Sequence, residues 1–542
     1  MSTRGVARRL ADPIFLASIT GVTILIVYLA DVKMAILYVV PGVIALLRII
    51  LPMVRQRGVG YGLDQDLVFL ITHMYTVSTG KPVRRRLFEL NTIIGDYGVY
   101  SHTLRRIAVL AVEWGYGFVR ATRLIAREVR NEVFRGFLFR LSEVLRTGED
   151  ISRFLRVEHD TLVRQYHANY MRSLDLLRIF LGLYATMMSS SAFIVLTLVI
   201  LAVFMGGDTR IFITSMAALL ISIGAFLPFI RMMSPHDPLT IGQRESMNPR
   251  LKRIRNLILV AGGLSLVITP LVFFITRDPL FTLGALAVPF ILPGMASMRF
   301  ERFLKNLNSF FQVFVRTFGL TYSVIPNYAE ALSSILTADY GPLTNFLRRL
   351  HARITNGIDP HIALRYFGLE ASSLHIAKSV NIIADTIDAG GDAAEMGLVL
   401  SNLLLRLNDL RIDRDRVSRT FEAVVYLLQG LIAGITAAIL NIMIIFASYY
   451  QRLAAAVGVA GVAQYLPFTI TLPNLSIVSW SLSVFLVGLV FVNAFLISYV
   501  RGGLFETSFF HVALLTIITV IGAKAMEIVS KLFVIPALVP PI

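Results

Sequence analysis

Long apolar segments alternate with long polar segments along this chain. An α-helix needs about 20 apolar residues to cross a bilayer, and nine segments approach that length. These candidate spans are residues 13–30, 34–51, 179–205, 211–230, 256–276, 279–298, 423–449, 475–499 and 508–530. Residues 453–474, which contain Pro467 and Pro473, are expected to form an outer loop or a re-entrant segment. The pattern predicts a membrane protein that crosses the bilayer many times.

Two polar regions, 52–178 and 299–420, interrupt the apolar segments. In residues 118–145 of the first region, apolar side chains recur at helical spacing with Arg and Glu between them. We therefore expect two helical bundles within an all-α polytopic membrane protein of about nine transmembrane helices. The predicted parts are N-terminal membrane helices (1–51), a first cytoplasmic helical domain (52–178), central membrane helices (179–298), a second cytoplasmic helical domain (299–420) and C-terminal membrane helices (421–542).

The two polar regions share sequence landmarks in the same order. An apolar helix leads to Pro82 in the first region and to Pro326 in the second, 244 residues later. Leu-Arg-Arg-Ile at 104–107 and Leu-Arg-Arg-Leu at 347–350 lie 243 residues apart, and glycine–acid turns at 148–150 and 390–392 lie 242 apart. Small insertions and deletions produce this slow drift. The landmarks predict a duplicated unit, a bundle followed by membrane helices.

Composition and charge narrow the class of protein. The chain has 542 residues, of which 56% are hydrophobic and 16% charged, with a mean hydropathy of +0.71. These values exclude a soluble globular protein and a disordered one. Cysteine is absent, which excludes disulfides, thiolate metal sites and cysteine nucleophiles.

The net charge of +17 is unevenly placed along the chain. With a cytoplasmic N-terminus, 45 of the 51 Lys and Arg residues fall in inner segments. Positive residues favour the cytoplasmic side of a membrane. We therefore expect both large domains in the cytoplasm of a cell-membrane protein and the C-terminus outside.

Gly80-Lys81 is the one segment that invites a nucleotide-binding interpretation. A phosphate-binding loop needs a glycine five residues before Gly80 and a Ser or Thr after Lys81, and this chain has Tyr75 and Pro82 there. We interpret the segment as a glycine that caps a helix before a proline.

Residues 158–160 (Glu-His-Asp) do not form the His-Glu-x-x-His motif with which a metalloprotease helix binds zinc. We interpret them as a solvated polar face of a helix. We therefore expect no enzymatic activity, no cofactor and no metal. A secondary transporter or channel remains the alternative function, because duplication with intervening spans is compatible with it. A membrane enzyme acting on lipid-linked substrates ranks last, because the predicted outer loops contain few acids.

Arginine clusters mark the first polar region. Residues 84–86 are three consecutive arginines, and Arg120, Arg123, Arg127 and Arg130 follow at helical spacing. Such residues meet anionic lipid headgroups, pair with acids on their own helix, or dock an acidic partner. No aromatic–basic pattern accompanies them, so a nucleic-acid partner is not expected.

The layout resembles the platform proteins of type II secretion and type IV pilus machines, and most closely the archaeal pilus and archaellum subfamily. The resemblance is carried by two cytoplasmic helical domains separated by membrane helices. It also rests on the turn at residues 77–82 (Val-Ser-Thr-Gly-Lys-Pro) and on the glycine–acid turns at 147–151 and 389–392. The second copy departs from the pattern, because 323–326 lacks the Gly-Lys pair and Gly391 replaces the acid. We therefore expect the two copies to contact different partners.

This resemblance implies a mechanical adaptor. The implied partners are a separate hexameric secretion ATPase, pilin-like subunits in the bilayer, membrane lipid and a second copy of the chain in a homodimer. Helices around 160–180 and 406–425 would carry motion into the spans. The candidate ATPase contacts are Arg84, Arg85, Arg86, Gly148, Glu149, Asp150, Gly390, Gly391 and Asp392. An archaellum, an adhesive pilus and a DNA-uptake pilus all remain open as the filament.

Overall fold

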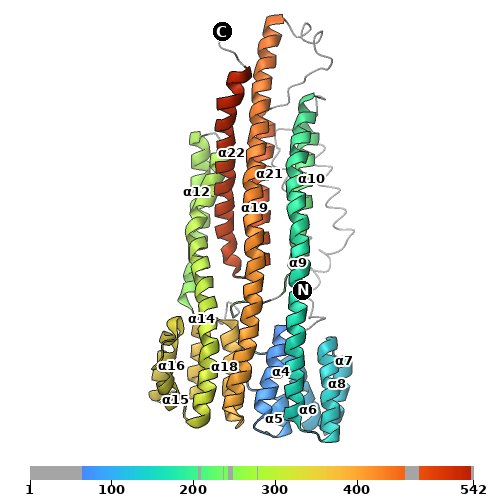
Figure 1. Cartoon of the computed structure of the whole chain (residues 1–542), viewed down its shortest axis with the longest axis vertical. Helices are drawn as coiled ribbons and strands as arrows, with labels where there is room; N and C mark the ends of the chain where they lie inside the picture. The colour runs from blue at the N-terminus through green and yellow to red at the C-terminus, as the bar shows by residue number, and fades with distance from the viewer. Residues whose placement is uncertain are drawn as a thin grey trace, which may run out of the picture.

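The computed structural model of this chain describes residues 64–204, 209–235, 237–241, 248–276, 279–457 and 475–538. Almost all of these residues are helical, and among them an isolated bridge between Thr240 and Ser373 is the one pairing of extended backbone. The helices run along the long axis of the molecule (Figure 1). Six helical segments of this part are long and apolar enough to cross a membrane. The prediction of an all-α polytopic membrane protein is confirmed.

The six membrane-crossing segments overlap six of the predicted spans. They belong to α9 (Ile151–Phe204), α10 with α11 (Thr209–Gly224 and Phe226–Met233), α12 (Pro249–Thr276), α19 (Ala393–Val457), α21 (Leu475–Arg501), and η4 with α22 (Phe505–Thr507 and Ser508–Leu538).

The predicted span 279–298 is divided. It comprises α13 (Pro279–Ala287), the 3₁₀ turn η2 (Val288–Phe290) and the first residues of α14 (Ile291–Val324). Pro289 and Pro293 lack a backbone donor, which suits the start of a helix and not its interior. Spans 13–30 and 34–51 and residues 458–474 lie outside the described residues, so the count of about nine stays a prediction.

Helices below the spans follow the same order in both polar regions. The first region contains α4 (Gln65–Ser78), α5 (Arg84–Phe88), α6 (Val99–Val112), α7 (Gly117–Glu128) and α8 (Glu132–Thr147), and then α9 begins. The second contains the end of α14, then α15 (Tyr328–Ile335), η3 (Gly341–Leu343), α16 (Thr344–Thr355), α17 (Pro360–Ala371) and α18 (Leu374–Asp388), and then α19 begins.

Corresponding helices begin at nearly constant offsets. Helices α5 and α15 start 244 residues apart, α7 and α17 start 243 apart, and α9 and α19 start 242 apart. These offsets equal those of the shared sequence landmarks. The correspondence favours the duplication, which stays a prediction together with the proposed domain boundaries.

Two very long helices connect the lower regions to the spans. Helix α9 has 54 residues and α19 has 65, lengths of about 80 Å and about 100 Å at the usual helical rise. Neither helix contains a proline, so neither has the commonest cause of a kink. Residues 160–180 and 406–425 lie inside these helices, which continue from there into the candidate spans (Figure 1).

Helix α19 lies at the centre of the packing. It contacts α14, α9, α21 and α22. Glycines bring its backbone against two of these neighbours. A Cβ at Gly397 would lie 2.9 Å from Cα of Gly319 on α14, and a Cβ at Gly522 on α22 would lie 2.6 Å from the carbonyl oxygen of Gly430. Small residues permit this close approach between helices, so α19 is held both below and within the spans.

The helical spacing in residues 118–145 belongs to two helices. Helix α7 ends at Glu128, and α8 starts at Glu132 because the side chain of Asn131 accepts a hydrogen bond from the backbone N–H of Phe134. Helix α8 ends where Gly148 adopts φ +77°. An N-cap and a left-handed glycine are the usual end signals of such a helix.

Candidate functional site

The turns that contain the predicted site residues lie at the end of the molecule remote from the spans. Figure 1 shows that α4, α8, α14 and α18 all reach this end, where α5, α9, α15 and α19 begin. We call it the distal end. The sequence-predicted residues therefore share one end of the fold, although they do not form one site.

Two predicted turns contact each other directly. A Cβ at Gly80, in the α4–α5 turn, would overlap the carbonyl oxygen of Ala389 and lie 2.8 Å from the backbone nitrogen of Gly391. The backbone N–H of Asp392 donates to Oγ1 of Thr79 at 2.8 Å. Residues 77–82 and 389–392 thus form an interface between the two polar regions, which the sequence did not predict.

The interpretation of Gly80 as a capping glycine needs correction. Helix α4 has Thr79 as its C-cap in a right-handed conformation, and Lys81, at φ +49°, adopts the left-handed backbone. The conformation of position 80 does not require glycine. Glycine is needed there because the backbone of residues 389–391 lies too close for a side chain.

The other glycine–acid turn stands apart. Gly148, Glu149 and Asp150 are exposed, and a Cβ at Gly148 would have no atom within 4 Å. The carboxylate of Asp150 accepts a hydrogen bond from the backbone N–H of Ser152 at 2.9 Å. The two glycine–acid turns therefore differ, because one is packed against α4 and the other is free to meet a partner.

The three consecutive arginines point in different directions. Arg84 and Arg85 are exposed, and Arg85 pairs with Glu89 at 2.8 Å. Arg86 forms an ion pair with Asp385 of α18, whose side chain is fully buried. Arg86 therefore joins the first polar region to the second, whereas Arg84 and Arg85 remain on the surface.

Helices α4 and α18 form an interface rich in buried polar contacts. Nε2 of His73 lies 2.9 Å from the carboxylate of Asp385, which also accepts the backbone N–H of Asn91 at 2.9 Å. Lys378 pairs with Asp66. Burial lowers the pKa of Lys378 to about 8, although the charge of Asp64 opposes this effect. Further contacts between α4 and α18 are Thr76–Thr386 at 2.9 Å and Gln65–His375 at 2.6 Å, and Tyr75 of α4 donates to Glu395 at the start of α19 at 2.7 Å.

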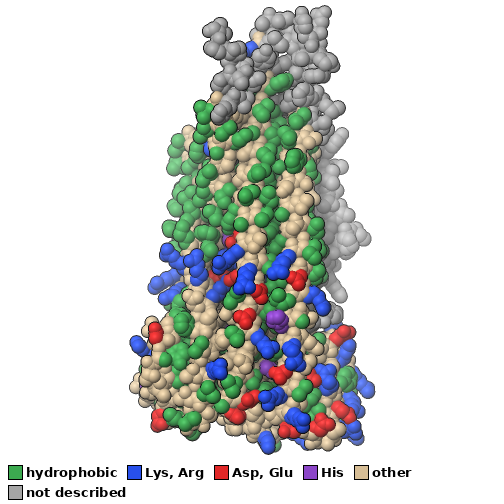
Figure 2. Space-filling model, in the orientation of Figure 1, with side chains coloured by type: hydrophobic (Ala, Val, Ile, Leu, Met, Phe, Trp, Pro, Cys, Tyr) green, Lys and Arg blue, Asp and Glu red, His purple; other side chains and the backbone are tan. Residues whose placement is uncertain are grey.

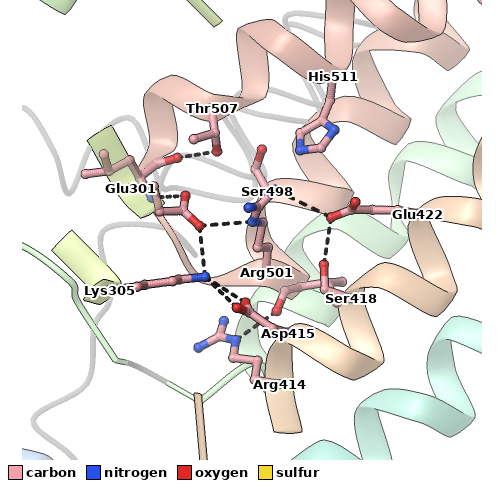
Figure 3. Close-up of polar contacts among 12 residues, drawn as sticks. Glu301, Lys305, Arg414, Asp415, Ser418, Glu422, Ser498, Arg501, Thr507 and His511 are labelled. Carbon is pink, nitrogen blue, oxygen red and sulfur yellow. Dashed lines mark hydrogen bonds and ion pairs between the residues drawn. The ribbon is translucent and has the colours of Figure 1, made fainter. Parts of the chain in front are cut away.

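A charged cluster lies where the long helices enter the spans (Figure 3). Its centre is Glu301 of α14, fully buried, which accepts from Nε of Arg501 at 3.0 Å and pairs with Nζ of Lys305 at 3.0 Å. Lys305 also binds Asp415 of α19 at 2.6 Å, and Arg501 lies 3.8 Å from Glu422. We call these five residues the boundary network.

Glu301 is charged despite its burial. Burial alone would raise its pKa, but the charges of Arg501 and Lys305 outweigh it and hold the pKa below its ordinary value. Buried charges are tolerated when paired and hydrogen-bonded in this way. The network therefore joins α14, α19 and α21 through ionised side chains.

Two further arginines of α19 bind the connection between α11 and α12. Arg414 donates to the carbonyl oxygens of Val500 at 2.8 Å and Pro235 at 2.7 Å. Arg411 forms a buried two-bond ion pair with Asp237, at 2.6 and 2.5 Å. Both arginines belong to a stretch of alternating acids and arginines on α19, and both are buried.

Inside the spans, a chain of hydrogen bonds links four helices. The hydroxyl of Tyr184 (α9) donates to Asn493 (α21), whose amide donates to Gln429 (α19) at 2.8 Å. Gln429 donates to Thr519 (α22) at 2.9 Å. All four side chains are buried. Polar groups in a bilayer must find partners among themselves, and here they do so across helices.

The predicted solvated face at residues 158–160 is only partly exposed. Glu158 is buried and receives two hydrogen bonds from Arg140, at 2.6 and 2.8 Å, and His159 is buried against Tyr75. Only Asp160 is exposed. The interpretation was wrong because the packing of α9 against α4 and α8 covers this face. Among the described residues, no group of three His, Asp or Glu could hold a metal ion.

Comparisons with known proteins agree with this architecture. The family model for type II secretion system protein F matches residues 314–444, from the lower part of α14 to the last quarter of α19. Flagella accessory protein J of Methanocaldococcus jannaschii is 25% identical over 538 residues, covering 96% of this chain and 95% of that protein. The protein of the same name from Methanococcus voltae is 22% identical over 528 residues, covering 90% and 91%. No solved structure matches the chain. These matches confirm the resemblance to archaeal type IV filament platform proteins.

Proposed function

We propose that this chain, similar along its length to archaeal type IV filament platform proteins, relays force from a separate cytosolic secretion ATPase to pilin-like subunits in the membrane. It performs no chemistry of its own in this proposal. The observation that carries the proposal is the pair of uninterrupted helices, α9 and α19, that run from the distal end into the spans.

The contacts along α19 support a rigid relay. Below the spans, α19 packs against α14 at Gly397 and Gly319. At the entrance to the spans, the boundary network ties it to α14 and α21. Within the spans, Gln429 bonds to α21 and α22. A displacement applied at the distal end would therefore move several spans together, because packed interiors transmit strain.

The distal end is the proposed face for the ATPase. The exposed candidates are Arg84, Arg85 and residues 148–150 of the first region, with Gly390 and Asp392 of the second. Arg86 and Gly391 would stabilise this face without contacting the ATPase, because each contacts the opposite polar region: Arg86 contacts Asp385, and Gly391 lies against the carbonyl oxygen of Thr76. The ATPase would thus press on both regions at once through the α4–α18 interface.

The distribution of charge supports a cytoplasmic distal end. Figure 2 shows Lys and Arg gathered where the apolar zone of the molecule ends. Arg250, Lys252 and Arg253 at the start of α12 are exposed. Basic residues favour the inner side of a membrane and anionic lipid headgroups. We accordingly place both polar regions in the cytoplasm, with lipid around the spans and a second copy of the chain as a further partner.

A kink in α9 between the distal end and the spans tests the relay. Arg172 is exposed on α9, and proline there would remove a backbone hydrogen bond and bend the helix. We expect Arg172→Pro to bind the secretion ATPase as the unmodified chain does but to assemble no filaments in cells. Arg172→Ala is the control and should assemble filaments normally.

Three outcomes would contradict the proposal. Filaments at normal abundance with Arg172→Pro would show that α9 transmits nothing. Nucleotide hydrolysis by the purified chain would contradict the passive role. Solute flux through the chain in liposomes, with no partner present, would favour the transporter alternative.

A further inference from the structure

The α6–α7 turn presents two aromatic side chains to solvent at the distal end. Trp114 is 68% exposed and Tyr116 is 49% exposed. Trp114 is one of two tryptophans in the chain, and the other, Trp480, belongs to α21. Tryptophan and tyrosine bury large apolar areas when they bind, and with arginine they dominate the energetics of protein interfaces. A tryptophan left in water is therefore a marker of an interaction surface.

The backbone holds this turn in a defined shape. Gly115 and Gly117 adopt φ +69° and +72°, a region that suits glycine. The backbone N–H groups of Glu113 and Trp114 both donate to the carbonyl of Val109, at 2.8 and 3.3 Å. A turn fixed before binding loses less conformational entropy when a partner arrives. The aromatic side chains are thus presented on a rigid support.

Helix α5 lies beside the turn and adds basic side chains. It contacts α6, and Phe88 stacks on Phe118 of α7 at 5.1 Å. The hydrogen bond and charge of Glu89 raise the pKa of Arg85, and the charge of Glu113 raises it slightly.

Val83, immediately before α5, is 82% exposed, and Arg84 and Arg85 are exposed next to it. We call Val83, Arg84, Arg85, Trp114 and Tyr116 the aromatic–arginine surface. Arg86 fixes α5 to α18 through Asp385, so the surface is attached to both polar regions.

The bilayer cannot reach this surface. From Ile151, at the distal end, to the start of the apolar part of α9 near residue 179, the helix rises about 42 Å. Bundle packing does not demand the aromatic residues either. The corresponding turn of the second region, residues 356–359, reads Asn-Gly-Ile-Asp and has no aromatic side chain. If the distal end faces the cytoplasm, as proposed above, the molecule that binds this surface must come from the cytosol.

We propose that the aromatic–arginine surface binds a cytosolic protein partner whose contact region is an apolar pocket edged by carboxylates. Trp114 would fill the pocket, and Arg84 and Arg85 would meet the carboxylates. The inference rests on the proposed function, in which that partner is the secretion ATPase, and it assigns the contact to the first region and not to the second.

Trp114 itself provides the reporter. In the Trp480→Phe chain, purified at full length in nanodiscs, Trp114 is the only tryptophan. We expect its emission to shift to shorter wavelength when the purified secretion ATPase is added, because the indole leaves water.

Trp114→Ala should raise the Kd for the ATPase about 30-fold or more, the size typical of a tryptophan that anchors an interface. Arg84→Glu with Arg85→Glu should slow association and reverse its salt dependence.

A matched control lies on the second region. Tyr366 is an exposed aromatic residue of α17, and Tyr366→Ala should leave the Kd unchanged. Trp114 is exposed, so its replacement should not alter the melting temperature, which separates loss of binding from loss of folding.

The possible results distinguish the two proposals. If the unmodified chain does not bind the ATPase, the proposed function fails. If it binds and Trp114→Ala binds equally well, the aromatic–arginine surface is overturned while the proposed function stands. A smaller oligomeric mass for Trp114→Ala by light scattering, with ATPase binding unchanged, would identify a second copy of the chain as the occupant and would also overturn this inference.

Discussion

Arg86 of α5 and Asp385 of α18 form an ion pair that joins the two polar regions across 299 residues of sequence. The carboxylate is fully buried and also meets His73 and the backbone N–H of Asn91. Asp385 on α18 thus contacts three parts of the first polar region: α4 through His73, α5 through Arg86, and the segment after α5 through Asn91. In the proposed relay, this pair would let a force applied to one polar region move both.

Removing Arg86 should destabilise the protein strongly. Arg86→Ala leaves the carboxylate of Asp385 buried without its cation, and breaking a buried pair in this way costs about 3–5 kcal/mol. Arg85→Ala removes an exposed pair with Glu89, which water screens and which therefore contributes little to stability. Thermal unfolding in the same detergent should therefore show a large shift for Arg86→Ala and a small one for Arg85→Ala. Equal shifts would mean that the Arg86–Asp385 pair does not hold the regions together.

This contrast also shows what the sequence could and could not predict. The spans and the long helices follow from apolar runs and helical spacing, which are local properties. The different roles of Arg84 and Arg86 are not local, because successive residues of a helix point about 100° apart and only the fold shows which direction meets α18. Gln65 and His375 lie 310 residues apart in the chain, and nothing in either segment indicates the other. Trp114 was missed because a lone tryptophan forms no pattern.

Adding a methyl group at Gly80 should separate the two distal turns. A Cβ there would overlap the backbone of Ala389 and Gly391, and overpacking of a tight contact costs about 1–3 kcal/mol. Gly148→Ala is the comparison, because its cost of about 1 kcal/mol comes from the left-handed backbone and not from contacts. Limited proteolysis at residues 79–83 should accelerate for Gly80→Ala and stay unchanged for Gly148→Ala. Equal protection of this turn in both variants would contradict the close packing.

His375 should make the protein less stable in acid. Burial and the charge of Arg411 together lower its pKa to about 3, against the opposing charge of Asp237. Between pH 6.5 and about 3 the unfolded chain binds a proton that the folded chain does not, so this group reduces the free energy of unfolding as the pH falls. The effect is absent above about pH 6.5. The difference in melting temperature between the unmodified chain and His375→Asn should therefore change as the pH is lowered from 7 to 4.5. A constant difference over that range would show that His375 does not titrate as its surroundings require.

Gln429 should couple the spans. Gln429→Leu removes the bonds to Asn493 and Thr519 and leaves two buried polar groups without these partners. Hydrogen bonds between membrane helices contribute about 0.6–2 kcal/mol, so the melting temperature should fall modestly while filament assembly falls further. Ser481→Ala is the control, because in the described part of the chain the hydroxyl of Ser481 bonds within its own helix, to the carbonyl oxygen of Ile477. If filaments persist with Gln429→Leu at equal protein level, the four spans need not move together.

Glu301 should be the most sensitive position of the boundary network. Glu301→Gln removes the charge that Arg501 and Lys305 share in a buried site, although each retains a second acid, Glu422 and Asp415 respectively. Because these partners remain, we expect a loss of stability near the lower end for a broken buried pair, about 3 kcal/mol.

The control and the functional readout for Glu301 follow from the same geometry. Asp413→Asn removes an exposed pair with Arg416 on the same part of α19, at 3.0 Å, and should change the melting temperature little. Glu301→Gln should still bind the secretion ATPase, because the distal end is remote from the network, yet should assemble few filaments. If both variants unfold at the same temperature and assemble filaments equally, the boundary network carries no force between the polar regions and the spans.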